Sequence, residues 1–168
     1  MPIYMGFFEK PNVLDKNFRG DVKAKGYEGW IELQSAQLGT NQRNGTSASG
    51  RGANREASAP AIQEIVITKL LDSVSTALFR EALSGKGKLI VIAFVKEGEA
   101  AYLKIVLQNT LITSYSVSGH GGDAQARPME SLSLNFTKIT YEMPATSPDT
   151  THSQMYQLGQ QANWTSYP

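Results

Sequence analysis

The chain has 168 residues, with 16 lysines and arginines against 15 aspartates and glutamates, so its formal net charge is +1. This near balance argues against a dedicated nucleic-acid binder, because such proteins usually carry a basic excess on one face. The absence of cysteine excludes a disulfide framework and a thiolate metal site. No apolar run approaches the ~20 residues that span a bilayer. We therefore expect a soluble single domain over residues 1–168, with no cofactor, no bound metal and no membrane insertion.

The first third of the chain predicts two strands and a long loop. Ile3 to Phe8 predicts the first strand, and Asn12 to Lys25 predicts an extended connection. Trp30 to Leu38 alternates well enough for a second strand. The segment from Gly39 to Pro60 is rich in Gly, Ser, Asn and Arg and cannot bury much apolar area. Because both its flanks are strand-like, we expect this loop to project from one domain and not to separate two.

A strand and a short helix follow. Gln63 to Leu70 contains the β-branched residues that suit a pleated surface. Asp72 or Ser73 can cap a helix start, and Gly85 can end the helix. Val74, Leu78 and Ala82 share one stripe at helical spacing, which predicts that this stripe faces the core.

The remaining elements are strands. Leu89 to Lys96 is nearly all apolar, as is typical of a strand covered on both faces, and Ala101 to Ile112 returns as its hairpin partner, continuing to Ser118. Ser131 to Tyr141 alternates clearly, with a phase slip at Lys138 that predicts a β-bulge. Residues 144–168 are weakly patterned. The order of elements predicts a mainly β fold, a barrel or a sandwich, with one helix.

Catalytic chemistry finds little support in the residues. Ser118, His120 and Asp123 lie close in sequence, but real triads converge from separate parts of a fold. His120 and His152 are far apart and have no cysteine partners, so they make a poor zinc set. We therefore expect no enzyme and no catalytic residues. Alternatives are a monomeric carbohydrate- or ligand-binding β-domain that uses exposed Trp or Tyr side chains and, as a distant third, a hydrolase that uses Ser118 and His120.

Five segments in order resemble the Hcp family, the tube subunits of the bacterial type VI secretion system. The segments are Met1 to Met5, Gly20 to Leu33, Arg55 to Phe79, Tyr115 to Gly119, and Glu130 to Ile139. The chain departs from the family pattern in a longer connection at 7–19, in extra residues at 119–129, and in the tail after Pro144.

The resemblance implies a compact β-barrel of two antiparallel-rich sheets with one flanking α-helix. It implies a homo-hexameric ring that stacks into a tube, with contractile sheath proteins, a tip spike protein and small effector proteins in the lumen as partners. It also implies assembly in the bacterial cytoplasm and secretion without a signal peptide, which agrees with the lack of a signal pattern at residues 1–8.

The resemblance also suggests roles for two groups of residues. The loop at 39–60 resembles the family loop that reaches the adjacent ring, and its charges for that contact are Arg43, Arg51, Arg55 and Glu56. Gln37 and Ser116 fall where lumen-facing residues of the family would fall. Strand alternation separates Ser114, Ser116 and Ser118 from Tyr115 and Val117, and the serines could equally face outside solvent or a neighbouring subunit.

Overall fold

The structure is a computed structural model that describes residues 1–41, 61–62, 64–96, 100–122, 124–143, 152–157 and 165–166. Its elements, in chain order, are β1 (Ile3–Lys10), β2 (Val13–Leu14), the 3-10 turn η1 (Lys16–Phe18), β3 (Ile31–Leu33), β4 (Ser35–Gln37), β5 (Thr40–Asn41), β6 (Ala61–Ile62), β7 (Ile65–Leu70), α1 (Ser75–Ser84), β8 (Lys88–Val95), β9 (Ala101–Ser118), β10 (Met129–Asn135), β11 (Lys138–Met143), β12 (His152–Gln157) and β13 (Thr165–Ser166).

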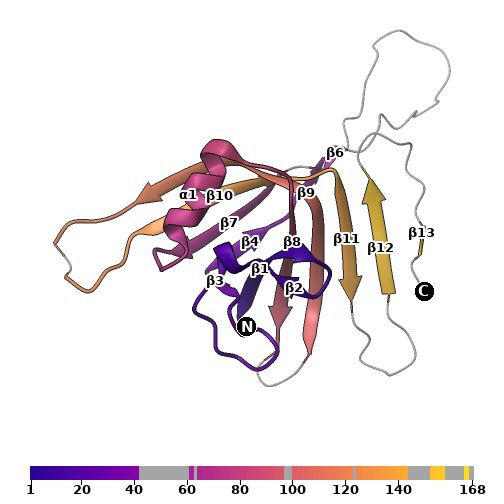
Figure 1. Ribbon diagram of the computed structural model, residues 1–168, viewed down its shortest axis with the longest axis horizontal. Coiled ribbons are helices and arrows are strands. Elements are labelled where there is room, and N and C mark those ends of the chain that lie inside the picture. The colour runs from indigo at the N-terminus through magenta and orange to yellow at the C-terminus, as the bar shows by residue number, and fades with distance from the viewer. Residues whose placement is uncertain are drawn as a thin grey trace, which may run out of the picture.

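Two antiparallel layers share the long strand β9 (Figure 1). In the first layer, β9 pairs β8 on one side and β11 on the other; β8 continues to β1 and β3, and β11 continues to β12 and β13. In the second layer the order is β4-β7-β10-β9. The mainly β class with one helix is therefore confirmed. The described strands do not close into a barrel, because no strand ladder joins β3 in the first layer to β4 or β7 in the second.

The strand β9 changes layers at a single residue. Its pairing with β8 and β11 ends by Thr110, and its pairing with β10 begins at Leu111. Between these two registers Asn109 has a φ of 50°. Asparagine tolerates this left-handed conformation better than most residues, since its short side chain can bond locally. One bent strand therefore replaces the two straight ones that a sandwich would need here.

The core lies between the two layers. The inward side chains of β1, β7, β8 and β10 alternate with outward ones, and Met5, Ile67, Ile92 and Leu132 are all fully buried. The helix α1 closes one end of this core with the stripe that the sequence predicts: Val74 and Leu78 are buried and Ala82 packs against them.

Three local expectations need correction. The strand expected over Trp30 to Leu38 is two strands, because the chain passes at Gln34 from β3 in the first layer to β4 in the second. The slip at Lys138 is a change of layer and no bulge: β10 ends at Asn135 and β11 begins at Lys138 on the opposite half of β9. The N-cap position of α1 is Val74, which provides no side-chain cap, while the carboxylate of the predicted cap Asp72 accepts from the Val74 N–H at 3.1 Å.

The 119–128 connection joins β9 to β10 as a hairpin that projects beyond the layers (Figure 1). The tail, whose last strand was uncertain from the sequence, adds β12 and β13 to the edge of the first layer. Within the described ranges, no helix is long and apolar enough to cross a membrane.

Candidate functional site

The outward side of the second layer carries two continuous rows of side chains, which we call the hydroxyl face. Strand register defines both rows, each with one residue from β4, β7, β10 and β9. They are Ser35, Thr68, Ser131 and Ser116 in one row, and Gln37, Val66, Ser133 and Ser114 in the other. Six of these eight side chains end in a hydroxyl, one in an amide, and none is charged.

The hydroxyl groups pair sideways across the strands. The Ser35 and Thr68 hydroxyl oxygens are 2.5 Å apart, and the Ser114 hydroxyl donates to the Ser133 hydroxyl at 3.0 Å. The row between them, Ala36, Ile67, Leu132 and Tyr115, points into the core, as the two-residue period of strands requires. The hydroxyl face is thus a polar, uncharged surface over a row of mainly apolar side chains.

Both lateral edges of this layer are open among the described residues. β4 pairs only β7, and residues 111–118 of β9 pair only β10. Each edge leaves backbone N–H and C=O groups available to another strand. An open edge at each side, of different sequence, permits head-to-tail pairing between copies.

The two residues predicted to face a lumen both lie on the hydroxyl face. Gln37 stands on β4 and Ser116 on β9, at opposite edges of the layer, and both side chains are exposed. The other predicted contact residues, Arg43, Arg51, Arg55 and Glu56, lie outside the described residues.

The described residues of the alternatives are not brought together into a catalytic group. His120 is exposed in the loop that follows β9, and the Ser118 hydroxyl donates to the Met129 carbonyl at 3.5 Å. Asp123 and the His152 side chain lie outside the described parts of the chain. Among the described side chains, no group of three or more His, Cys, Asp or Glu residues could hold a metal ion.

Beneath the hydroxyl face lies a buried ion cluster of Lys69, Asp72, Ser75, Tyr115 and Glu130. The ammonium of Lys69 is 2.6 Å from a carboxylate oxygen (Oε2) of Glu130 and 2.8 Å from Oδ1 of Asp72, and it also donates to the Leu70 carbonyl at 2.8 Å. The side chains of Lys69 and Glu130 are both fully buried.

Two hydroxyl groups donate further hydrogen bonds to the Glu130 carboxylate. The Ser75 hydroxyl donates to Oε2 at 2.8 Å, and the Tyr115 hydroxyl donates to Oε1. Burial of the phenol and its hydrogen bond to Glu130 raise the pKa of Tyr115 well above its ordinary value, so the donor proton stays in place at neutral pH. Each charge in the cluster is therefore paired and hydrogen-bonded, as buried charges require.

The cluster joins three elements at one point. Lys69 is the next-to-last residue of β7, Glu130 is the second residue of β10, and Ser75 is the first residue of α1. It therefore fixes the start of the helix against the two central strands of the hydroxyl face. Neither Lys69 nor Glu130 is singled out by the sequence reasoning, although both fall in phase with the inward residues Ile67 and Leu132.

Comparison with known proteins gives one consistent family. The family model described as type VI secretion system effector, Hcp, matches residues 10–143, which is most of the chain. The curated protein hcp1 of Pseudomonas aeruginosa is 32% identical over 82 residues, covering 46% of this chain and 49% of its own length. The match therefore spans about half the length of that relative.

Solved structures share the fold over nearly the whole chain. A structure described as a type six secretion system protein has a TM-score of 0.77 at 17% identity and covers 94% of this chain and 95% of its own. Hcp1 from Salmonella typhimurium has a TM-score of 0.71 at 18% identity, with 93% of each chain covered. At such low identity these two structures show the shared fold and no more.

Proposed function

The chain belongs to the Hcp family of type VI secretion system proteins, and from this premise we propose that it is a structural tube subunit. In this proposal, six copies form a ring, the rings stack, and the hydroxyl face lines the lumen. The single observation that carries the proposal is the hydroxyl face itself, a two-row polar surface with an open strand edge on each side.

The edges explain how a ring can form from one kind of chain. Pairing the β9 edge of one copy with the β4 edge of the next joins two different surfaces, which is a heterologous contact. Repeated around an axis, such contacts close into a ring, and every open edge then becomes paired. The hydroxyl faces of all copies would then form one continuous inner wall.

The composition of the hydroxyl face suits such a wall. A lumen that carries folded cargo must stay wetted and must not hold apolar surfaces by hydrophobic contact. Uncharged hydroxyl groups offer hydrogen bonds to cargo and repel neither acidic nor basic proteins. We propose that small effector proteins bind there, and that Gln37 and Ser116 contact them.

Ring formation is tested by mass. Six copies of the 18.3 kDa subunit give about 110 kDa for a closed cyclic ring. We expect light scattering after gel filtration to show this species at micromolar subunit concentration. A monomer alone across a broad concentration range would refute the tube proposal and favour a monomeric ligand-binding domain.

Cargo binding is tested by introducing a charged side chain on the hydroxyl face. Ser116→Arg places one exposed cation per subunit on the hydroxyl face, so we expect rings of unchanged mass that retain a lumen-bound effector about tenfold more weakly, a loss of ~1.4 kcal/mol. Pull-down of a co-expressed effector measures retention. Val13→Arg, at a 49% exposed residue on β2 in the other layer, is the matched control. Unchanged retention with Ser116→Arg would remove Ser116 from the cargo surface.

Stacking is assigned to the loop at 39–60, whose contact charges we propose to be Arg43, Arg51, Arg55 and Glu56. Deleting residues 44–54 is expected to leave rings intact and to abolish long tubes and secretion. Electron microscopy of the purified rings measures tube formation, with the undeleted chain as its reference. Tubes of normal length from the deleted chain would exclude this role.

We further propose a sheath of contractile proteins around this tube and a spike protein at its tip. The subunit would assemble in the bacterial cytoplasm and leave the cell when the sheath contracts. Family membership supports these partners and this route.

A further inference from the structure

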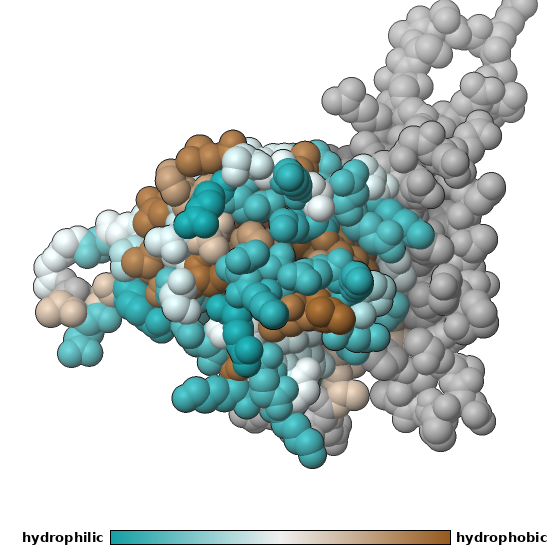
Figure 2. All heavy atoms as spheres, viewed as in Figure 1, coloured by the Kyte–Doolittle hydropathy of each residue, from teal (hydrophilic) through white to brown (hydrophobic). Residues whose placement is uncertain are grey.

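The helix α1 exposes an apolar stripe that the subunit does not cover. Phe79 is 50% exposed and Leu83 is 73% exposed, although both are large apolar residues. With Thr76 and Arg80 they share one face at helical spacing, opposite the buried stripe of Leu78. Figure 2 shows this apolar surface along the part of the molecule where α1 lies. Large exposed side chains gathered on one helix face are typical of a contact surface.

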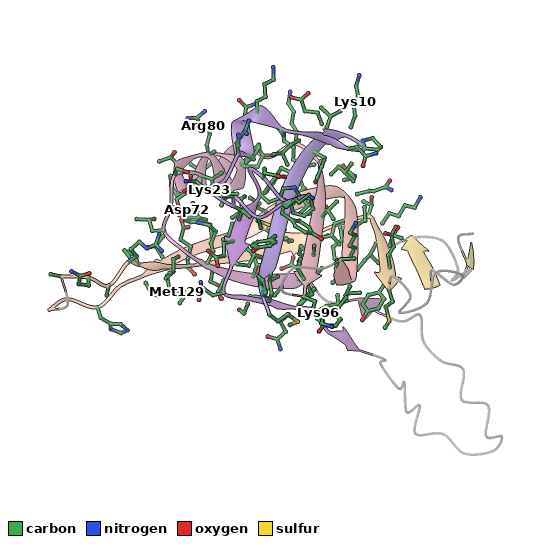
Figure 3. The ribbon with its side chains drawn as sticks, turned by 90° about the horizontal axis from the view of Figure 1, so that it is seen from below. Lys10, Lys23, Asp72, Arg80, Lys96 and Met129 are labelled. Carbon is green, nitrogen blue, oxygen red and sulfur yellow. The ribbon has the colours of Figure 1, made fainter. Side chains whose placement is uncertain are left out.

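The stripe adjoins the open edge of β9. The rings of Phe79 and Tyr115 meet edge-on, with centroids 5.4 Å apart, and Tyr115 belongs to the half of β9 that has this open edge. Arg80 projects outward from the helix (Figure 3). Any strand that pairs with β9 at this edge therefore brings its own subunit close to the exposed stripe.

A concave, largely apolar surface lies on the opposite side of the molecule, lined by β1, by the segment 24–30 and by the end of β8. We call it the aromatic groove. It has a volume of about 960 Å³, and Tyr4, Tyr27 and Trp30 lie in its wall. The Tyr27 ring lies 5.2 Å from Tyr4 and 5.1 Å from Trp30, centroid to centroid.

The groove depends on a glycine in β1. A Cβ atom at Gly6 would lie 2.7 Å from the Phe8 ring and 3.1 Å from the Trp30 ring. Without that atom the indole can lie over β1, next to the chain that leads into β3. The groove therefore lies over β1 and the segment that leads into β3, and β3 continues along the chain into the open-edged strand β4.

Charge supports a match between stripe and groove. The last turn of α1 has no basic residue and contains Glu81, so the helix dipole and this carboxylate make this end of the helix negative. Among the described residues that line the groove, Lys25, Lys96 and Lys104 are basic and Glu28 is acidic. Glu28 is thus a partner for Arg80, and the three lysines suit the helix end.

We propose that the aromatic groove of one copy receives the exposed α1 stripe of the next copy, beside the pairing of β9 with β4. This inference rests on the proposed tube function and names the surfaces that close its ring. The two surfaces differ in shape and composition and lie on opposite sides of one subunit: in both Figures 1 and 3 the helix and the Lys96 end of β8 are far apart. They cannot meet within a copy, and their contact is head-to-tail.

Cysteine cross-linking tests the contact directly, because the chain has no cysteine of its own. Copies carrying Leu83→Cys are mixed with copies of different tag length carrying Lys25→Cys, at the groove's rim, and treated with a short bismaleimide. We expect cross-linked pairs of unlike copies and no pairs when either variant is treated alone. Lys10→Cys, at another exposed lysine outside the groove, replaces Lys25→Cys in the control and should give no pairs.

A second measurement does not depend on the reach of the cross-linker. Leu83→Glu should raise the subunit concentration at which rings dissociate about 30-fold, as for loss of one interface hot spot, whereas Leu83→Met should leave it unchanged. Normal rings that give no Leu83–Lys25 pairs and tolerate Leu83→Glu would overturn this interface and leave the tube proposal standing. Failure of the unmodified chain to form rings would overturn both.

Discussion

Replacing Lys69 with alanine is expected to lower the free energy of unfolding of the subunit by about 3–5 kcal/mol, the usual cost of breaking a buried ion pair by removing one partner. Lys69 lies between two carboxylates, at 2.6 Å from Glu130 and 2.8 Å from Asp72. Without the ammonium, Glu130 keeps only two hydroxyl donors, and the two acids face each other. The start of α1 would lose the contacts that Lys69 of β7 makes with Ser75 and Asp72.

Urea denaturation at one fixed subunit concentration measures this loss, since ring formation also contributes to apparent stability. Lys88→Ala is the matched control. Lys88 pairs at 3.3 Å with one carboxylate, the buried Asp15, but is itself 26% exposed. Its removal should therefore cost about 1–3 kcal/mol, less than the removal of Lys69. The double variant Lys69→Met with Glu130→Leu should recover most of the stability, because apolar residues can replace a buried pair. Equal losses for Lys69→Ala and Lys88→Ala would contradict the role given to the cluster.

The sequence predicts the elements of the fold better than it predicts their assignment to layers. The sequence pattern locates β1, β7, β8 and β9 closely, and the stripe of Val74, Leu78 and Ala82 identifies the inner side of α1. The sequence predicts one strand where the structure has β3 and β4, which meet at Gln34. Local alternation cannot show this, because it carries no information on which layer a residue joins. The same limit explains the slip at Lys138, where a change of layer resembles a bulge.

The candidate site was predictable in part for a physical reason. Alternate serines on β9 indicate one polar side, and the structure places Ser116 and Gln37 on one face. The face also includes β4, β7 and β10. Sequence patterns cannot show this, because it depends on pairing between segments that are distant in sequence. The pair Lys69 and Glu130 was detectable in principle, since both charges fall in phase with buried neighbours.

The helix α1 then offers a comparison that separates folding from assembly. Leu78 and Leu83 lie on the same helix, but Leu78 is fully buried in the core and Leu83 is 73% exposed. Leu78→Ala should destabilise the subunit by about 2–5 kcal/mol, through lost burial and the cavity left behind. Leu83→Ala should change the stability of the isolated subunit by no more than about 0.5 kcal/mol, because the side chain contacts mainly solvent there.

On ring assembly, Leu83→Ala should have the larger effect and Leu78→Ala the smaller one. Leu83→Ala removes part of the proposed contact, so rings should dissociate at a higher subunit concentration while each subunit stays folded. Leu78→Ala keeps the exposed stripe, so copies that remain folded should still assemble. Urea unfolding of dilute subunits and light scattering over a dilution series measure the two effects separately. If Leu83→Ala destabilised the isolated subunit as much as Leu78→Ala, its side chain would belong to the fold, and α1 would have no free face for a second copy.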